Sequence, residues 1–496
     1  MKLGHAENPI QQSRLIFNYT TMATNIPAEK AALVMNTLKD QANKTLGPSK
    51  NVNLEVFHAD GAGNFPYNFE DPNGDRFNIE TYKWMNKALQ KRNEGDPVSA
   101  EGDYNGKFRQ AITKVNYNMS TDDQEILTKA KQNSIAQQRS LIKTWQEVGL
   151  SLPDGKLPID GIVHVIRTEW TSDEKVSLRD MQNAPDLFAL LDNAPASGMP
   201  VIPIFGQYLQ AIGDGISVVN DQSLNDGILS TVRSNSITGS KLNGGIQMND
   251  GTDIFYPAYE FSISQEKILN ELRFDDHSVE VGLTMTDISE TETSLSVGGD
   301  ASFKMPLGFF DLHLEAQANF FTKIIAKQST KIEIDMIFRG VTVAKFGPQD
   351  FLLSSRKGWH FPEAPKKAIQ NGDQDITGFQ FAPKPNFDFG ENGDFGYINA
   401  VAISQYPEIN LKIFSKSFTQ IDTELQAAVG GKLKIDFLGI PMSIGSKASF
   451  SGSNTTVNET EGSVSIKLSA PKEIYAGTSA EETAYVLGVQ TEYSAV

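Results

Sequence analysis

Residue types that could do acid–base or metal chemistry are present, but few stand at a recognisable spacing. The six histidines are scattered, and none belongs to an H-E-x-x-H metal-binding pattern. The chain has no cysteine, which excludes disulfides, thiolate metal sites and cysteine nucleophiles. It also lacks a Walker A motif and a Gly-x-Ser-x-Gly nucleophile elbow. The sequence therefore predicts no catalytic residue.

One acidic stretch approaches the spacing of a calcium-binding loop. Asp71, Asn73 and Asp75 alternate as the first oxygen ligands of an EF-hand do. An EF-hand also needs Gly at the sixth position and Glu at the twelfth, where this chain has Arg76 and Tyr82. The pattern excludes an EF-hand. A Ca²⁺ site of another kind stays open, beside the simpler interpretation of a turn, and no other cofactor is expected.

The clearest pattern is an alternation of apolar and polar residues between Ser294 and Phe338, which is typical of strands with one buried face. The change of parity across Gly308 predicts a tight connection between two antiparallel strands there. The alternating apolar residues are Leu295, Val297, Ala301, Phe303, Met305 and Leu307, then Leu312, Leu314, Ala316, Ala318 and Phe320, then Ile332, Ile334, Met336 and Phe338.

The same layout returns near the C-terminus. Val297-Gly298-Gly299 recurs as Val429-Gly430-Gly431, 132 positions later, and the apolar parity stays in register through four segments. Few residues are identical between the copies, so the inference depends on the pattern. We interpret the two stretches as an internal duplication of one antiparallel β-module.

The predicted fold class is α+β. A mostly helical N-terminal domain (1–245) is followed by a first β-module (246–358), a connector rich in Pro, Gly and Asn (359–396) and a second β-module (397–496). The two modules are expected to be β-sandwich-like.

Several elements of the N-terminal half are predicted from spacing and capping signals. The strongest is a helix over 121–148, which starts at a capping-box pattern and carries an apolar stripe. Weaker patterns predict helices over 27–46, 79–92, 173–182 and 185–191, a turn-rich stretch over 93–119, and a strand over 159–170 with His164 on it. The apolar stretch 200–219 fits a buried helix, a strand pair or a partner-facing segment.

Composition limits the class of partner. The formal net charge is −17, which disfavours nucleic acid and anionic lipid surfaces as electrostatic partners. No apolar run reaches the roughly 20 residues of a transmembrane helix, and the first residues lack the apolar core of a signal peptide. We expect a cytoplasmic protein, or one released by a signal-independent route.

The connections within the two alternating regions are unusually apolar for hairpins. A hairpin that inserts into a bilayer needs about 9–11 alternating residues per strand, and both regions provide arms of roughly this length. An ordinary sandwich with covered connections explains the alternation more simply. The residues expected to contact a membrane or a protein partner are Met305, Leu307, Phe309, Phe310, Phe437, Leu438, Ile440 and Met442.

The sequence therefore favours a non-enzymatic, β-rich interaction protein. Its most concrete mechanism is toxin-like membrane perforation, in which homo-oligomerisation precedes insertion of hairpins at 294–320 and 426–451. One alternative is a structural subunit of a larger particle. Another is a hydrolase with β-sandwich binding modules, whose site would lie in 50–80 or 160–220.

Overall fold

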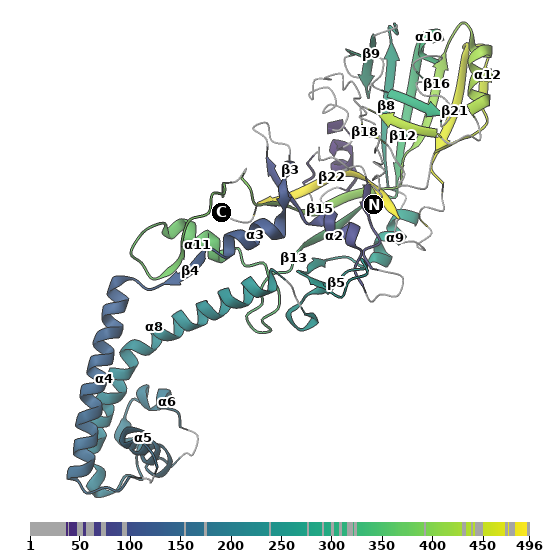
Figure 1. Cartoon of the computed structure of the whole chain (residues 1–496). Helices are drawn as coiled ribbons and strands as arrows, with labels where there is room; N and C mark the ends of the chain where they lie inside the picture. Colours follow the sequence, from purple (N-terminus) through teal and green to yellow (C-terminus); the bar gives the residue numbers. More distant parts are fainter. Residues whose placement is uncertain are drawn as a thin grey trace, which may run out of the picture.

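The molecule is long, with β-sheets at one end and in the middle and a helical arm at the other end (Figure 1). The computed structural model contains helices and antiparallel strands, which confirms the predicted α+β class. It describes residues 36–37, 39–46, 53–55, 64–70, 76–91, 97–152, 155–172, 176–237, 240–274, 277–289, 292–298, 302–306, 310–314, 321, 325–390, 393–428, 433–437, 440–441, 450–471, 475 and 482–493.

Two long helices form the arm. α4 (Thr121–Glu147) packs along α8 (Val201–Asn235), so the predicted helix over 121–148 is confirmed, and the open stretch 200–219 is the first half of α8. The side chain of Ser120 caps α4 by accepting a hydrogen bond from the Asp123 amide at 3.2 Å. Within the described residues, even α8 lacks an apolar stretch suited to crossing a bilayer.

A small helical head closes the far end of the arm. It contains α5 (Pro158–Glu169), α6 (Leu178–Gln182), α7 (Leu187–Leu190) and the 3₁₀ turn η1 (Ala196–Gly198). Trp145 of α4 and Trp170 stack in its core, with ring centroids 5.3 Å apart. The predicted strand over 159–170 is wrong, because Ile159, Ile162 and Ile166 are buried at helical spacing after a proline at the first helical position.

The remaining N-terminal elements are shorter than predicted. Residues 36–37 and 39–46 are helical, as expected, whereas 27–35 lie outside the described residues. The helix predicted over 79–92 ends early, as α2 (Ile79–Met85), because the chain turns at Asn86 into β2 (Lys87–Lys91). The stretch 93–119, predicted to be turn-rich, contains β3 (Pro97–Asp103), α3 (Tyr104–Ile112) and β4 (Val115–Asn118).

A seven-stranded central sheet brings together strands from the N-terminal and C-terminal parts of the described chain. Its main path runs β1 (Asn64–Pro66), β22 (Thr483–Tyr493), β15 (Gly396–Ser404), β13 (Thr342–Pro348) and β7 (Tyr259–Phe261), and β2 and β3 extend it beside β15. α9 (Gln265–Phe274) packs on β13, and α11 (Glu363–Asn371) packs on β14 (Gly378–Phe381), which pairs with β4. Two short pieces, η2 (Lys241–Asn243) and the pair β5 (Ile246–Gln247) and β6 (Phe255–Tyr256), precede β7.

The upper sheet has eight strands and includes strands from both predicted β-modules. Its path runs β10 (Phe303–Pro306), β9 (Glu292–Val297), β8 (Ser278–Thr286), β12 (Lys331–Arg339), β16 (Glu408–Phe414), β21 (Ser463–Ser469) and β19 (Ser451–Gly452), with β20 (Thr456–Asn458) also beside β21. The strands are joined into one sheet because β12 pairs with β16.

The strand pair predicted across Gly308 is not formed here. β10 pairs with β9 instead, and β11 (Phe310–Leu314) pairs with β17 (Leu433–Phe437) in a separate three-stranded sheet. β18 (Ile440–Pro441) completes that sheet.

A continuous two-stranded ribbon connects the central and upper sheets. β13 continues back into β12 through Gly340 and Val341, while β15 continues into β16 through residues 405–407. The ribbon bends at this joint, where Gly340 has φ +63°. A Cβ added at Gly340 would lie closer to the Leu272 carbonyl oxygen of α9 than van der Waals contact permits.

Replacement of Gly340 by alanine is expected to destabilise the joint. The variant combines the cost of an L-residue at positive φ with a backbone clash, together about 2 kcal/mol or more. Gly102→Ala is the matched control, because Gly102 has φ +82° in β3 but open space around its Cα. Urea titration should show a larger loss of unfolding free energy for Gly340→Ala, and equal losses would refute the role of the Leu272 contact.

Candidate functional site: two insertions on an amphipathic sheet

Four central strands of the upper sheet have one apolar and one polar face. In β8, β12, β16 and β21, alternate side chains are buried and apolar, and their neighbours are partly or fully exposed, apart from the buried Ser463 at the start of β21. The buried residues are Val279, Val281, Leu283 and Met285 in β8, Ile332, Ile334, Met336 and Phe338 in β12, Ile409, Leu411 and Ile413 in β16, and Val464, Ile466 and Leu468 in β21.

Parts of two insertions help to cover the apolar face. The first, 287–330, joins β8 to β12, and the second, 415–462, joins β16 to β21. α12 (Phe418–Ala428) of the second insertion packs on β21, and its Ile421 and Leu425 are fully buried in the same core as the strands. Phe321 and Ile325 of the first insertion, just before α10 (Ala326–Gln328), are also fully buried in this core.

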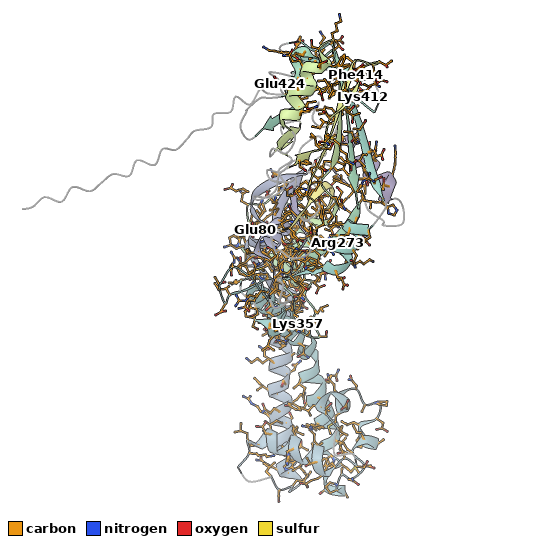
Figure 2. The ribbon with its side chains drawn as sticks, turned by 90° about the vertical axis from the view of Figure 1, so that its right-hand side faces the viewer. Glu80, Arg273, Lys357, Lys412, Phe414 and Glu424 are labelled. Carbon is orange, nitrogen blue, oxygen red and sulfur yellow. The ribbon has the colours of Figure 1, made fainter. Side chains whose placement is uncertain are left out.

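Ion pairs cross the polar face. Lys412 of β16 lies 2.6 Å from Glu461, and Lys467 of β21 lies 2.6 Å from Glu408. The Lys412 ammonium is also 4.9 Å from the centroid of the Phe414 ring. Lys412 and Phe414 lie at the far end of the upper sheet, close to α12 (Figure 2). The polar face of the sheet is therefore suited to contact with water and with charged groups.

Two carboxyl groups on the polar face have pKa values shifted in opposite directions. Hydrogen bonding from Lys412 holds the pKa of Glu461 below its ordinary value. Partial burial, reinforced by the negative charges of Glu333 and Glu280, raises the pKa of Asp335. The ionised form of Glu461 is therefore stabilised by its neighbours, whereas the ionised form of Asp335 is destabilised by burial and by nearby negative charges.

The insertions also pair with one another through the three-stranded sheet. Phe310 is the register partner of Phe437, Leu312 of Ile435 and Leu314 of Leu433. Phe437 is in turn the register partner of Ile440 on β18. The predicted tips of separate hairpins thus meet at adjacent register positions.

The structure places only part of the predicted contact set. Phe310, Phe437 and Ile440 are brought together by register, whereas Met305 pairs with Thr293 in the β9–β10 ladder. Leu307, Phe309, Leu438 and Met442 lie outside the described residues. Their proposed contact with a membrane or partner stays a prediction.

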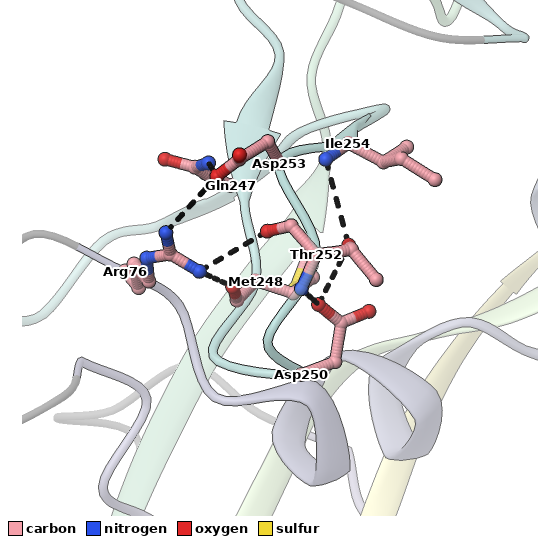
Figure 3. A network of polar contacts seen from close by, with 7 residues as sticks. All are labelled: Arg76, Gln247, Met248, Asp250, Thr252, Asp253 and Ile254. Carbon is pink, nitrogen blue, oxygen red and sulfur yellow. Dashed lines mark hydrogen bonds and ion pairs between the residues drawn. The ribbon is translucent and has the colours of Figure 1, made fainter.

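The weak calcium candidate lies outside the described residues, since these begin again at Arg76. The Arg76 guanidinium donates to the Met248 and Thr252 carbonyl oxygens at 3.3 and 3.1 Å and pairs with Asp253 at 3.2 Å (Figure 3). Its role in the described part is to hold the loop before β6. In the described part of the chain, no group of three or more His, Asp or Glu could hold a metal ion.

One histidine stands in a polar chain that resembles catalytic geometry. His360 Nδ1 lies 2.7 Å from Asp350 Oδ1, and Nε2 lies 2.9 Å from the Tyr104 hydroxyl. The Tyr104 hydroxyl would be the reacting end, but Tyr104 is fully buried among Phe108, Trp359 and Tyr397. A substrate cannot reach the buried Tyr104 hydroxyl. The hydrogen bonds that link Asp350, His360 and Tyr104 therefore stabilise the packing of α3 on the central sheet.

One of the two ranges proposed for a hydrolase site, 160–220, contributes to a groove on the arm. A cavity of about 270 Å³ on the arm is lined by residues of α4 and α8 that include Leu127, Ala211, Ile212 and Val219, without a carboxylate or histidine. His164 lies on α5 rather than on a strand. The hydrolase alternative gains no support from these contacts.

Sequence reasoning missed α12 as the cover of the apolar face. The spacing of Phe418, Ile421 and Leu425 is helical and could have predicted it. The Lys–Glu pairs had no usable signal, because each joins residues far apart in the sequence.

Comparison with known proteins adds no relative. No family model, no curated protein and no solved structure matches this chain. Its function must be argued from its own geometry.

Opposite effects are expected when the two shifted carboxyl groups are neutralised. A raised folded-state pKa contributes stability below the unfolded pKa and loses it as pH rises, so Asp335→Asn should raise the melting temperature near pH ~7, with the gain vanishing near pH ~3. A lowered pKa does the reverse, so Glu461→Gln should lower the melting temperature near pH ~7, with the loss shrinking as pH falls. Shifts of the same sign in both variants would contradict this account of the polar face.

Proposed function

We propose that the chain is a non-enzymatic membrane-perforating protein whose two insertions refold into amphipathic β-hairpins. The arms of each hairpin extend the strands that flank the insertion. Apolar tips enter lipid, and the polar face lines a water-filled lumen shared by several copies. The described structure is then the state stored in water.

The observation that supports this proposal is the register of the two flanking ladders. Met285 pairs with Ile332 in the β8–β12 ladder. If the ladder continued through 287–330 in the same register, the chain would have to reverse direction between Gly308 and Phe309. We call this position the closing point of the ladder. Ile413 pairs with Val464 in the β16–β21 ladder, which closes likewise between Leu438 and Gly439. Both closing points coincide with the apolar tips that the alternation predicts.

The register of the second closing point matches one strand pair of the described structure. Phe437 pairs with Ile440 and Asp436 with Pro441 between β17 and β18, which is the register that the β16–β21 ladder would impose. Each arm would exceed the roughly 9–11 residues that a membrane-spanning strand needs. The two hairpins could therefore cross a bilayer while staying joined to the upper sheet.

Apolar parity is compatible with the same extension. Buried apolar residues have odd numbers in β8 and β16 and even numbers in β12 and β21. The arm from Leu295 to Leu307 keeps the odd parity of β8, and the arm from Leu312 to Phe320 has the even parity of β12. Phe321 and Ile325 depart from the pattern next to β12, so the tip-proximal part carries the strongest signal.

The sequence of α12 fits both a helix and a strand. Ile421 and Leu425 lie one helical turn apart and are buried in the stored state. As a strand, Ile421, Thr423 and Leu425 would alternate with Gln420, Asp422 and Glu424, in the odd parity of β16. A segment with both periods can leave the apolar face and extend the ladder.

The duplication suggested by the sequence supports the same model. β8 and β12 form an adjacent antiparallel pair, and so do β16 and β21. The two register closures lie 130 positions apart, from Gly308 to Leu438, which is one alternation step from the shift of 132. We infer that each copy is a strand pair with its own insertion.

A structural subunit of a larger particle is the second candidate. Apolar side chains that are 41–46 % exposed along the arm, at Ile126, Ile135, Val219 and Leu224, favour it because assembly would bury them. Light scattering separates the two candidates. An assembly without lipid supports the subunit, whereas a monomer that becomes large only with liposomes supports perforation.

A disulfide that holds β9 against β8 is expected to block dye release from liposomes, because the proposed first hairpin needs β9 to leave β8 and continue the β8–β12 ladder. Thr284 and Ser296 are register partners on β8 and β9, and the chain has no other thiol to interfere. Partner Cα atoms in antiparallel strands lie about 4.5–5.5 Å apart, within disulfide range. The oxidised Thr284→Cys/Ser296→Cys variant should be inactive, and reduction should restore release.

The matched control locks two strands that stay paired in the proposed mechanism. Asp335 and Asn410 are partners on β12 and β16, so the oxidised Asp335→Cys/Asn410→Cys variant should release dye as the reduced form does. Wild-type protein that releases no dye under any trigger, including protease and low pH, would rule out perforation. Full release by the oxidised Thr284→Cys/Ser296→Cys variant would refute the refolding of the first insertion.

A further inference from the structure

A cavity of about 570 Å³ lies at the joint between the central and upper sheets. The end of α9 contributes Arg273 and Phe274, and the end of β12 contributes Ile337 and Arg339. Residues 405–408 between β15 and β16, together with Tyr475, close the remaining sides. Figure 2 shows Arg273 where the body of the molecule meets the upper sheet.

The cavity carries positive charge in a chain that is strongly acidic overall. Arg273 is fixed by donating one N–H to the Tyr475 carbonyl oxygen, which leaves other donors of its guanidinium for a ligand. Among the described residues, none accepts a hydrogen bond from the exposed Arg339 side chain. The lining carboxylate, Glu408, is neutralised by Lys467 at 2.6 Å.

The lining also has an apolar part. Phe274 is 75 % exposed, and Ile337 and Ala470 lie on the same cavity. Small-molecule sites measure about 300–1,000 Å³ and combine apolar walls with a few polar groups. A bare inorganic anion would leave much of this space unfilled.

We propose that this cavity binds an organic anion whose charged end is a phosphate or carboxylate and whose body is apolar. The guanidinium fork of arginine matches both charged groups with paired hydrogen bonds. Phe274 and Ile337 contact the apolar body. The ligand would touch α9 on one side and β12 on the other, and so would fix the angle at the joint. This site does not depend on the proposed membrane activity.

Phenyl phosphate is a suitable probe, and isothermal titration calorimetry on the full chain measures its binding. We expect saturable binding that Arg339→Gln weakens at least about tenfold, since a hydrogen bond to a charged group has an effect of that order. Arg139→Gln is the matched control, because Arg139 is an exposed arginine on α4, remote from the cavity. It changes net charge equally and should leave the affinity unchanged.

Two further binding measurements make the outcome decisive. Inorganic phosphate should bind more weakly than phenyl phosphate, and equal affinities would refute the apolar part of the site. Vesicles of phosphatidylcholine containing phosphatidic acid compete with phenyl phosphate if the natural source is a lipid headgroup, and leave its binding intact if the source is a soluble anion. No binding by the wild type, or equal loss in Arg339→Gln and Arg139→Gln, would overturn the proposal.

Discussion

The two-residue period of a β-strand is the constraint on which the upper half of this molecule depends. Once Met285 is paired with Ile332, every later pair of the β8–β12 ladder is determined, and so is the face on which each side chain lies. A slip of one residue would carry the whole apolar set to the polar face. An insertion that extends the ladder must therefore change parity where the ladder closes, and both insertions do so.

In the proposed mechanism, the medium decides which structure this pattern adopts. In water, the apolar face of the four strands must be covered, and Ile421 and Leu425 of α12 contribute to that cover within the chain. An extended hairpin would expose the same face over its whole length, so water opposes it. Lipid removes that opposition, because apolar side chains no longer need another part of the protein. The sequence of α12 fits both a helix and a strand, and is therefore suited to adopt the helix in water and the strand in lipid under this proposal.

Local patterns in the sequence predicted local structure, and failed where two periods compete or where partners are distant. The helix α4 and the alternation of β9 and β12 followed from spacing alone. The apolar run after Pro158 fits both periods over a few residues, so α5 was mistaken for a strand. The pairing of Phe310 with Phe437 joins segments more than a hundred residues apart, and no local signal selects it over a pair across Gly308. The apolar tips followed from the sequence because apolar turns are unusual, and their contact with a membrane or partner stays a prediction.

The joint between the sheets connects these properties. Because β12 continues into β13 and β15 into β16, these two connections join the upper sheet directly to the body, and a reorientation of the upper sheet would bend the ribbon at Gly340 and residues 405–407. Gln405 Nε2 donates to the Leu272 carbonyl oxygen at 2.6 Å, and the Tyr406 amide donates to the Tyr475 hydroxyl at 2.6 Å, so the bend is held from both sides. The anion cavity shares this region, with Gln405, Tyr406 and Tyr475 in its lining. A ligand there would act on the contacts that set the angle of the upper sheet, and through that angle on the insertions it carries.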